Sequence, residues 1–254
     1  MRISKRSASN NGRLPRAAFA LFLVAVAAFV VSARLQTVAL NLLYPNEKTF
    51  THARVSLLAM TRTHIALTLA ATALSSLAGT GLGILVTRRF ALPFYPVVRR
   101  MNAFIQTFPP SAVIILAFPF LGFGWEPTLF ALFLYSLFPV LGNCAVALKG
   151  VDPAILDSAD GMGMTDGQRL RIVELPLALP LILAGIRHAY ILNLGTATIG
   201  AVIGAGGLGT IIISGLTLRN SAFVLSGTIV VVSLAFIGER FFSFLERRLP
   251  PLGR

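Results

Sequence analysis

The sequence predicts an all-α, polytopic membrane protein with about six transmembrane helices. Three numbers carry this prediction: 56% of the 254 residues are hydrophobic, only 12% are charged, and the mean hydropathy is +0.80. Soluble domains carry about 25% charged residues, so this chain has too little charge for an aqueous surface. The single cysteine, Cys144, lies inside an apolar segment, which leaves no disulfide framework and no cysteine-based metal site.

Six apolar windows are long enough to cross a membrane, because about 20 helical residues span a hydrocarbon core of roughly 30 Å. They lie near residues 17–35, 63–86, 101–121, 127–148, 177–204 and 222–243. We divide the chain accordingly into three parts. Residues 1–62 hold a basic tail, a first membrane anchor and an external connection, residues 63–248 hold the main helical core, and residues 249–254 form a short tail.

Lysine and arginine cluster in the short segments between apolar windows, although the net charge of +13 is large. Cytoplasmic loops of membrane proteins retain positive charge. With the N-terminus inside, 17 of the 22 basic residues fall on the cytoplasmic side; the others are Arg34, Lys48, Arg54, Arg62 and Arg219. We therefore expect a multi-pass protein of the inner membrane with both termini in the cytoplasm. No nucleic-acid partner is expected, because the basic residues form no single patch.

The first apolar window has two interpretations. A basic start, an apolar run and the small residues of VVSAR also fit a signal peptide cleaved near Ala33. The run is long for a signal peptide, which favours an uncleaved anchor. In either case we expect residues 46–64 to be an external connection, in which an amphipathic helix could lie on the surface and His52 and His64 are surface residues.

Two classes of membrane protein are disfavoured by the ionisable residues. No window carries an isolated acid at mid-depth, since Glu126 and Glu239 lie near predicted ends, whereas ion-coupled carriers usually need such a group. His188 is the only histidine in the apolar body, so intramembrane hydrolysis has no catalytic set. We expect no enzyme activity, catalytic residue, metal or cofactor, and Arg187 should turn toward the cytoplasm or pair with an acid.

The polar residues concentrate in one cytoplasmic loop, residues 152–176. Asp152 and Pro153 predict a helix start, because aspartate caps helices and proline suits the first helical position. Gly161 and Gly163 should end that helix. Thr165 with Gln168 forms a capping box that begins a second helix, which we expect to end at about Glu174, before Pro176.

This loop resembles a motif of the membrane subunits of ATP-binding-cassette (ABC) importers. Their loop has the form E-A-A, three residues, G, nine residues, I-x-L-P. Here the same spacing joins Asp157-Ser158-Ala159, Gly163 and Val173-Glu174-Leu175-Pro176, with Asp, Ser and Val replacing Glu, Ala and Ile. The resemblance covers residues from about 64 to 248. It implies a type I importer fold, similar to the MetI permease, in which this loop is the coupling region that docks on a separate ATPase.

The coupling loop also offers an apolar ridge for docking. Six side chains contribute to it: Ile155, Leu156, Met162, Met164, Leu170 and Ile172. Arg169 and Glu174 are expected to be exposed, and such pairs contribute no more than about 1 kcal/mol. The alternative is that residues 152–174 are merely a solvated loop.

Residues 185–209 resemble the permeases of osmoprotectant and quaternary-amine importers, whose solutes include glycine betaine, choline and carnitine. Methionine and phosphonate importers share the glycine-rich end but differ over residues 193–198. Neutral hydrogen-bonding groups could line the pathway; they are Asn193, Thr196 and Thr198. Helix packing is the alternative role for each.

The glycine-rich element at residues 204–209 has no following Lys-Ser/Thr, so it is no phosphate loop. It should form a flexible external turn near the outer gate: Gly204, Gly206, Gly207 and Gly209.

Together these features predict the permease subunit of an ABC importer for osmoprotectants. The resemblance implies four kinds of partner: ATPase subunits, a second permease subunit of the same or a different sequence, an external solute-binding protein and the lipid bilayer. Two alternatives remain open. One is a permease of the same type for another solute, such as methionine or a phosphonate, and the other is a membrane scaffold without transport activity.

Overall fold

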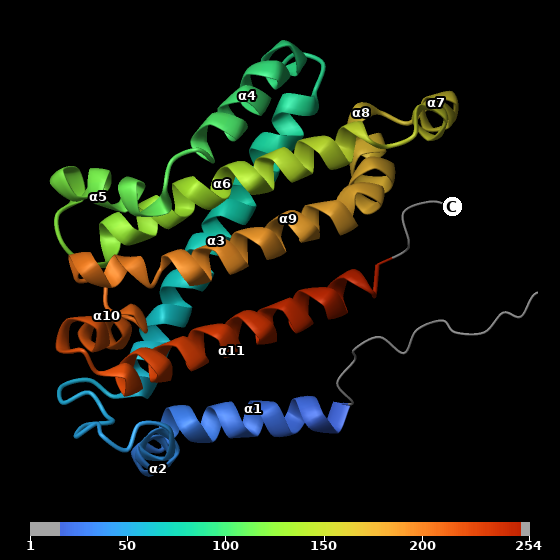
Figure 1. The fold of residues 1–254 in the computed structure, drawn as a ribbon. Helices are drawn as coiled ribbons and strands as arrows, with labels where there is room; N and C mark the ends of the chain where they lie inside the picture. Colours follow the sequence, from blue (N-terminus) through green and yellow to red (C-terminus); the bar gives the residue numbers. More distant parts are fainter. Residues whose placement is uncertain (1–15, 250–254) are drawn as a thin grey trace, which may run out of the picture.

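A computed structural model describes residues 16–249, and within that range every regular element is helical (Figure 1). Four long helices contact one another, with α3 packed against α6 and α9, and α9 packed against α11. The elements follow in the order α1 (Arg16–Val31), α2 (Ala33–Leu43), α3 (Leu57–Thr87), η1 (Leu92–Phe94), α4 (Tyr95–Ile105), α5 (Pro110–Leu121), α6 (Trp125–Lys149), α7 (Pro153–Gly161), α8 (Asp166–Arg169), η2 (Leu170–Glu174), α9 (Leu175–Thr196), η3 (Ile199–Ile203), α10 (Gly209–Leu218) and α11 (Ser221–Glu246).

The predicted all-α membrane fold is confirmed. Within the described residues, four helical stretches are long and apolar enough to cross a membrane: Leu57–Thr87, Trp125–Lys149, Asp166–Thr196 and Ser221–Glu246. Two bent helix pairs raise the number to six if each pair counts as one span. The short helix α10 was not predicted, because its 10 residues are fewer than the roughly 20 that a spanning window needs.

The windows 17–35 and 101–121 are not the single straight helices that we predicted. The first is bent by 100° between α1 and α2, and the second by 96° between α4 and α5. Ser32 accepts a hydrogen bond from the backbone N–H of Leu35, which starts α2 as a new helix. Pro109 is extended, with ψ 135°, and Pro110 begins α5. Hydropathy windows miss such breaks, since a proline pushes its preceding residue out of the helical conformation while remaining apolar.

The external connection is shorter than we predicted, because α3 begins at Leu57 after the cap of Ser56. His64 therefore lies in the second turn of α3 and is fully buried, so its prediction as a surface residue was wrong. Its Nε2–H donates to the carbonyl oxygen of Leu194, at 3.0 Å. In a continuing helix that carbonyl would accept from Thr198, whose N–H donates instead to Gly195. His64 thus satisfies a carbonyl that is freed where α9 ends.

Two glycines of α3 allow its close approach to α6. A Cβ at Gly79 would lie 2.9 Å from the carbonyl oxygen of Leu137, and a Cβ at Gly83 would lie 2.6 Å from Cβ of Cys144. Both distances are below any normal contact, so only glycine fits at this crossing. Small residues at such points let membrane helices make extensive van der Waals contact. The thiol of Cys144 is buried there as a packing group.

Replacing Gly83 with leucine should therefore destabilise the α3–α6 crossing. Overpacking of this kind costs about 1–3 kcal/mol, which thermal unfolding of the purified protein would detect. Gly81 is the matched control, because a Cβ there meets nothing within 4 Å. Equal destabilisation by Gly83→Leu and Gly81→Leu would contradict the assignment of this crossing.

Candidate functional site

The first half of the coupling loop folds as its capping residues predict. Asp152 accepts a hydrogen bond from the N–H of Ala154, at 2.9 Å, and Pro153 is the first residue of α7. The helix ends in a Schellman motif, in which the N–H of Met164 donates to Ala159 and the N–H of Gly163 donates to Asp160. Gly163 has a φ of +77°. Gly161 is the last residue of α7, so Gly163 alone provides the predicted break.

The second half of the loop contains a feature that we did not predict. The capping box of Thr165 and Gln168 is present at the start of α8. The helix does not end at Glu174, however, but continues into α9 through the π turn η2. The extra residue of a π turn widens the helix, which accommodates Pro176, since proline has no N–H to donate. The predicted interruption before Pro176 was therefore wrong.

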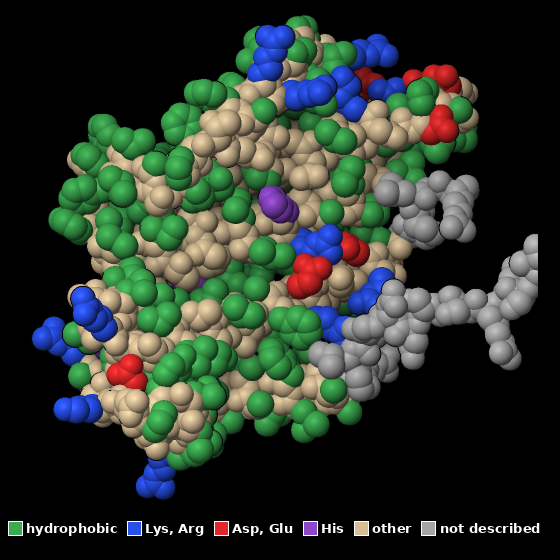
Figure 2. Space-filling view, in the orientation of Figure 1, with side chains coloured by type: hydrophobic (Ala, Val, Ile, Leu, Met, Phe, Trp, Pro, Cys, Tyr) green, Lys and Arg blue, Asp and Glu red, His purple; other side chains and the backbone are tan. Residues whose placement is uncertain are grey.

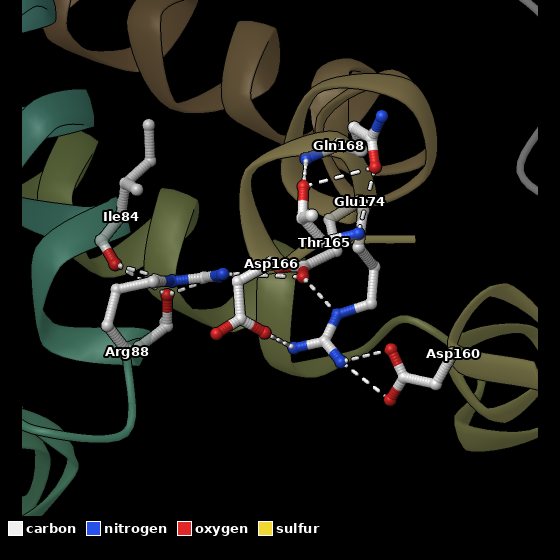
Figure 3. A network of polar contacts seen from close by, with 9 residues as sticks. Ile84, Arg88, Asp160, Thr165, Asp166, Gln168 and Glu174 are labelled. Atoms are coloured by element: carbon white, nitrogen blue, oxygen red, sulfur yellow. Dashed lines mark hydrogen bonds and ion pairs between the residues drawn. The ribbon is translucent and has the colours of Figure 1, made fainter. Parts of the chain in front are cut away.

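An ion network joins the loop to the end of α3 (Figure 3). Glu174 in the π turn accepts from Arg88 at 2.5 Å and from the Nε of Arg169 at 3.2 Å. The same Arg169 contacts both carboxylate oxygens of Asp160, at 2.6 and 2.7 Å, and Asp166 at 3.2 Å. Three segments, the end of α3, the loop helices and the start of α9, are thus tied to one carboxylate.

The network is more buried than the sequence suggested. The side chain of Glu174 is 5% exposed, that of Arg169 14% and that of Arg88 21%. Our expectation that Arg169 and Glu174 are exposed was wrong, because Glu174 is a buried residue of the π turn and pairs there with Arg88 and Arg169. A buried charge needs a close partner to offset its lost hydration. Arg88 was overlooked as a site residue, since the sequence places Arg88 and Arg89 equally at the end of a predicted span.

The residues of the resembling motif occupy three different environments. Asp157 and Ser158 are exposed on α7, whereas Ala159 is buried against the rest of the loop. Val173 and Leu175 are half-buried and Pro176 is exposed. Leu175 packs against the core between α6 and α9. The motif therefore combines an outward-facing helix with residues that attach it to the transmembrane core.

Only half of the predicted apolar ridge is fully available for docking. Met162 is 70% exposed, Ile172 61% and Ile155 40%. Leu156, Met164 and Leu170 are half-buried, and Leu170 packs against the same α6–α9 core as Leu175. Exposed apolar side chains bordered by charges are typical of a protein-binding surface. Figure 1 shows α7 at the outer edge of the helical body, where a second protein could reach it.

The predicted pathway residues lie at the opposite end of α9. Asn193 is buried, and its Nδ2 donates to Thr72 of α3 and Ser136 of α6, both at 3.1 Å. Thr196 is also buried, while Thr198 is half-buried and donates to the carbonyl of Gly195. In this single chain Asn193 thus joins three helices. A role of these residues in lining the pathway stays a prediction.

The glycine-rich element forms a defined turn between η3 and α10. Gly204, Gly206 and Gly207 have φ between +75° and +83°, a conformation that favours glycine. Gly207 packs against His64, and a Cβ at Gly209 would lie 2.0 Å from the carbonyl oxygen of Thr198. The turn therefore needs glycine for both its backbone angles and its contact with the end of α9. Within residues 16–249, no group of three or more His, Cys, Asp or Glu side chains could hold a metal ion.

Removing the charge of Glu174 should loosen the loop. In Glu174→Gln the two guanidinium groups lose their shared counter-charge, and breaking a buried pair costs about 3 kcal/mol or more. Hydrogen exchange should then be faster throughout α7, and the thermal midpoint should fall. Asp166→Asn is the control, because Asp166 contacts Arg169 but is 75% exposed, and such a contact contributes about 1 kcal/mol at most. Equal effects of the two substitutions would exclude a central role for Glu174.

Three comparisons place the chain among known proteins. Residues 79–250 match the family model of the binding-protein-dependent transport system inner membrane component. The choline transport system permease protein OpuBB of Bacillus subtilis is 39% identical over 197 residues, which cover 78% of this chain and 90% of that protein. The glycine betaine/carnitine/choline permease OpuCB of the same organism is 38% identical over the same shares. The osmoprotectant import permease OsmY of Salmonella typhimurium is 36% identical over 198 residues, 78% of this chain and 84% of that protein.

The solved structures support the fold. An inward-facing structure of the methionine ABC transporter MetNI matches with a TM-score of 0.69 at 21% identity, covering 74% of this chain and 94% of the matched chain. An amino acid ABC transporter with histidines matches with a TM-score of 0.61 at 20% identity, covering 74% and 92%. The family match, the relatives and the helical architecture agree. This chain belongs to the inner membrane components of binding-protein-dependent transport systems, the multi-pass permease subunits of ABC importers.

Proposed function

We propose that this protein is the permease subunit of an ATP-driven importer of quaternary-amine osmoprotectants, such as glycine betaine, choline or carnitine. The observation that carries the proposal is the 39% identity to a choline permease over 90% of that protein's length. The permease itself catalyses no reaction in this proposal. ATP hydrolysis belongs to a partner ATPase and solute capture to an external binding protein.

The coupling loop supplies the contact with the ATPase. Its exposed apolar side chains lie beside charges in three places: Ile155 in α7, Met162 directly after α7 and Ile172 in the π turn η2. The helix α7 is fixed at both ends, by the cap of Asp152 and by the turn at Gly163. The network around Glu174 joins this helix to α3 and α9, so a displacement by the ATPase would reach two membrane helices directly. Contiguous ion pairs and rigid helices are the physical means by which such movements pass between sites.

We infer further that both termini and the coupling loop face the cytoplasm. The count of 17 basic residues among 22 on that side supports this orientation. The start of α1 lies against the end of α11, where Phe19 contacts Phe236 and the guanidinium of Arg240. Figure 1 shows these two helix ends on the same side of the molecule as α7 and α8.

The solute class follows from the relatives and not from the fold. The match to MetNI at 21% identity reflects a shared architecture, so a methionine or phosphonate permease remains the second candidate.

A permease needs a pathway for its solute. We place this pathway near Asn193, Thr196 and Thr198 and the turn of residues 204–209, with a second permease subunit completing it. A scaffold without transport activity would need neither an ATPase nor a solute-binding protein, so a requirement for these partners distinguishes the two functions.

Uptake should require the ATPase and should not respond to ion gradients. Proteoliposomes holding the permease, its ATPase and its binding protein should accumulate labelled glycine betaine or choline only when ATP is present on the ATPase side. A hydrolysis-deficient ATPase is the control. Gradient-driven uptake without ATP would contradict the importer assignment, and uptake of methionine instead would favour the second candidate.

Replacing Gly163 with valine should uncouple the permease from its ATPase. Its φ of +77° costs a β-branched residue about 1–2 kcal/mol of strain, which the exposed loop can relieve by tilting α7. Membrane insertion should be normal, while co-purification of the ATPase, or the stimulation of its activity by loaded binding protein, should fall. Gly167→Val is the control, because a Cβ at Gly167 meets nothing within 4 Å and its φ is not positive. Normal coupling in Gly163→Val would exclude the loop as the docking site.

A further inference from the structure

A polar cavity of about 500 Å³ opens between the membrane helices, away from the coupling loop. Its polar lining comes from four parts of the chain: Gln106 after α4, Asn143 of α6, Arg187 and His188 of α9, and Glu239 of α11. Volumes of roughly 300–1,000 Å³ are typical of small-molecule sites. None of these polar residues belongs to the coupling loop or to the predicted pathway set.

The cavity contains an ion pair between two of the long helices, α9 and α11. The Nη1 of Arg187 lies 3.1 Å from Glu239 and 3.4 Å from Glu246. Arg187 follows the start of α9 by 12 residues, about 18 Å along the helix. Charged groups inside membrane helices face a protein interior or a water-filled cavity. Figure 2 shows acidic and basic side chains gathered near the middle of this face beside a histidine.

The ion pair is accessible from the cavity. The side chain of Arg187 is 28% exposed and that of Glu239 43% exposed, whereas the coupling-loop carboxylate of Glu174 is almost completely covered. Within the described residues, both ion pairs of Arg187 use its Nη1, which leaves the Nε and Nη2 donors for another acceptor. A solute entering the cavity therefore meets one guanidinium and one carboxylate next to each other.

The arrangement of charges selects a class of solute. A guanidinium binds a carboxylate through two parallel hydrogen bonds, and a carboxylate attracts an ammonium group. A simple anion would be repelled by Glu239, and a simple cation by Arg187. A small zwitterion has both complementary groups. The single ion pair between Arg187 and Glu239 can then be replaced by two ion pairs, one from each side chain to the solute. His188 provides the only aromatic ring among the residues that line the cavity, so the aromatic cage that binds quaternary ammonium tightly is missing and release remains easy.

We propose that this cavity is a transient binding site for zwitterionic quaternary amines, in which Arg187 takes the carboxylate and Glu239 the ammonium group. The inference rests on the proposed function for its solute class and adds where in the membrane the solute pauses. It also predicts a preference: glycine betaine, which has both charges, should depend on Arg187, whereas choline, which lacks the carboxylate, should depend on Glu239 and should not need Arg187.

The test measures binding to the permease–ATPase complex in lipid nanodiscs, without the binding protein, by saturation-transfer NMR with glycine betaine and choline as probes. Arg187→Gln should weaken glycine betaine binding about tenfold, the effect of one lost charge-assisted hydrogen bond, and should not weaken choline binding, because Arg187 repels a simple cation. Glu239→Gln should weaken both. Glu246→Gln is the matched control, because Glu246 contacts the same Arg187 nitrogen but does not line the cavity; it should leave the preference unchanged.

Two further measurements separate a binding role from a structural one. Arg187→Lys keeps a positive charge for Glu239 but loses the planar fork, so it should fold like the wild type and still lose glycine betaine selectively. Equal loss of both probes in Arg187→Gln and Arg187→Lys, or no saturable binding to a wild-type complex that imports glycine betaine, would overturn the site. A wild-type complex that imports no quaternary amine would instead overturn the proposed function.

Discussion

Glu174 carries one buried negative charge between two guanidinium groups from different parts of the chain. Such a charge is tolerated only when its partners are close, so the arrangement of the loop depends on the position of α3. If the end of α3 moves, Arg88 moves with it, and the carboxylate must follow or lose its compensation. The same holds in reverse for a force applied to α7, since Asp160 is bound to Arg169. The loop and two membrane helices are therefore positioned jointly.

Local signals explain what the sequence predicted correctly. Asp152, Thr165 and Gln168 act on backbone groups within a few residues, so their caps can be identified without knowledge of the fold. Gly163 adopts its left-handed conformation for the same local reason. The predicted windows 127–148 and 222–243 end within about three residues of the ends of α6 and α11, because long apolar stretches have few alternatives to a helix. About six spans was the upper number that the structure allows.

The features that were missed depend on contacts between distant residues. His64 and Leu194 are 130 positions apart, and Arg88 and Glu174 are 86 apart; no local pattern identifies such pairs. One signal was available for the polar interior of α3, where buried polar side chains recur every three or four residues: Thr61, His64, Thr68, Thr72 and Ser75. This spacing marks a single helix face. It would have indicated that the polar stripe, His64 included, faces neighbouring helices and not the outside.

The π turn explains why the number of residues between Gly163 and Pro176 matters. A chain with one residue fewer between positions 170 and 174 could still form an uninterrupted helix from α8 into α9. Each residue of an α-helix turns by about 100°, so everything before the deletion, including Arg169 and the whole of α7, would rotate by that angle about the axis of α9. The exposed side chains of α7 would then face another direction. The number of residues in the loop motif thus sets the rotation of α7 about the axis of α9. It fixes the direction in which the cytoplasmic helix points, and the length of the connection is secondary.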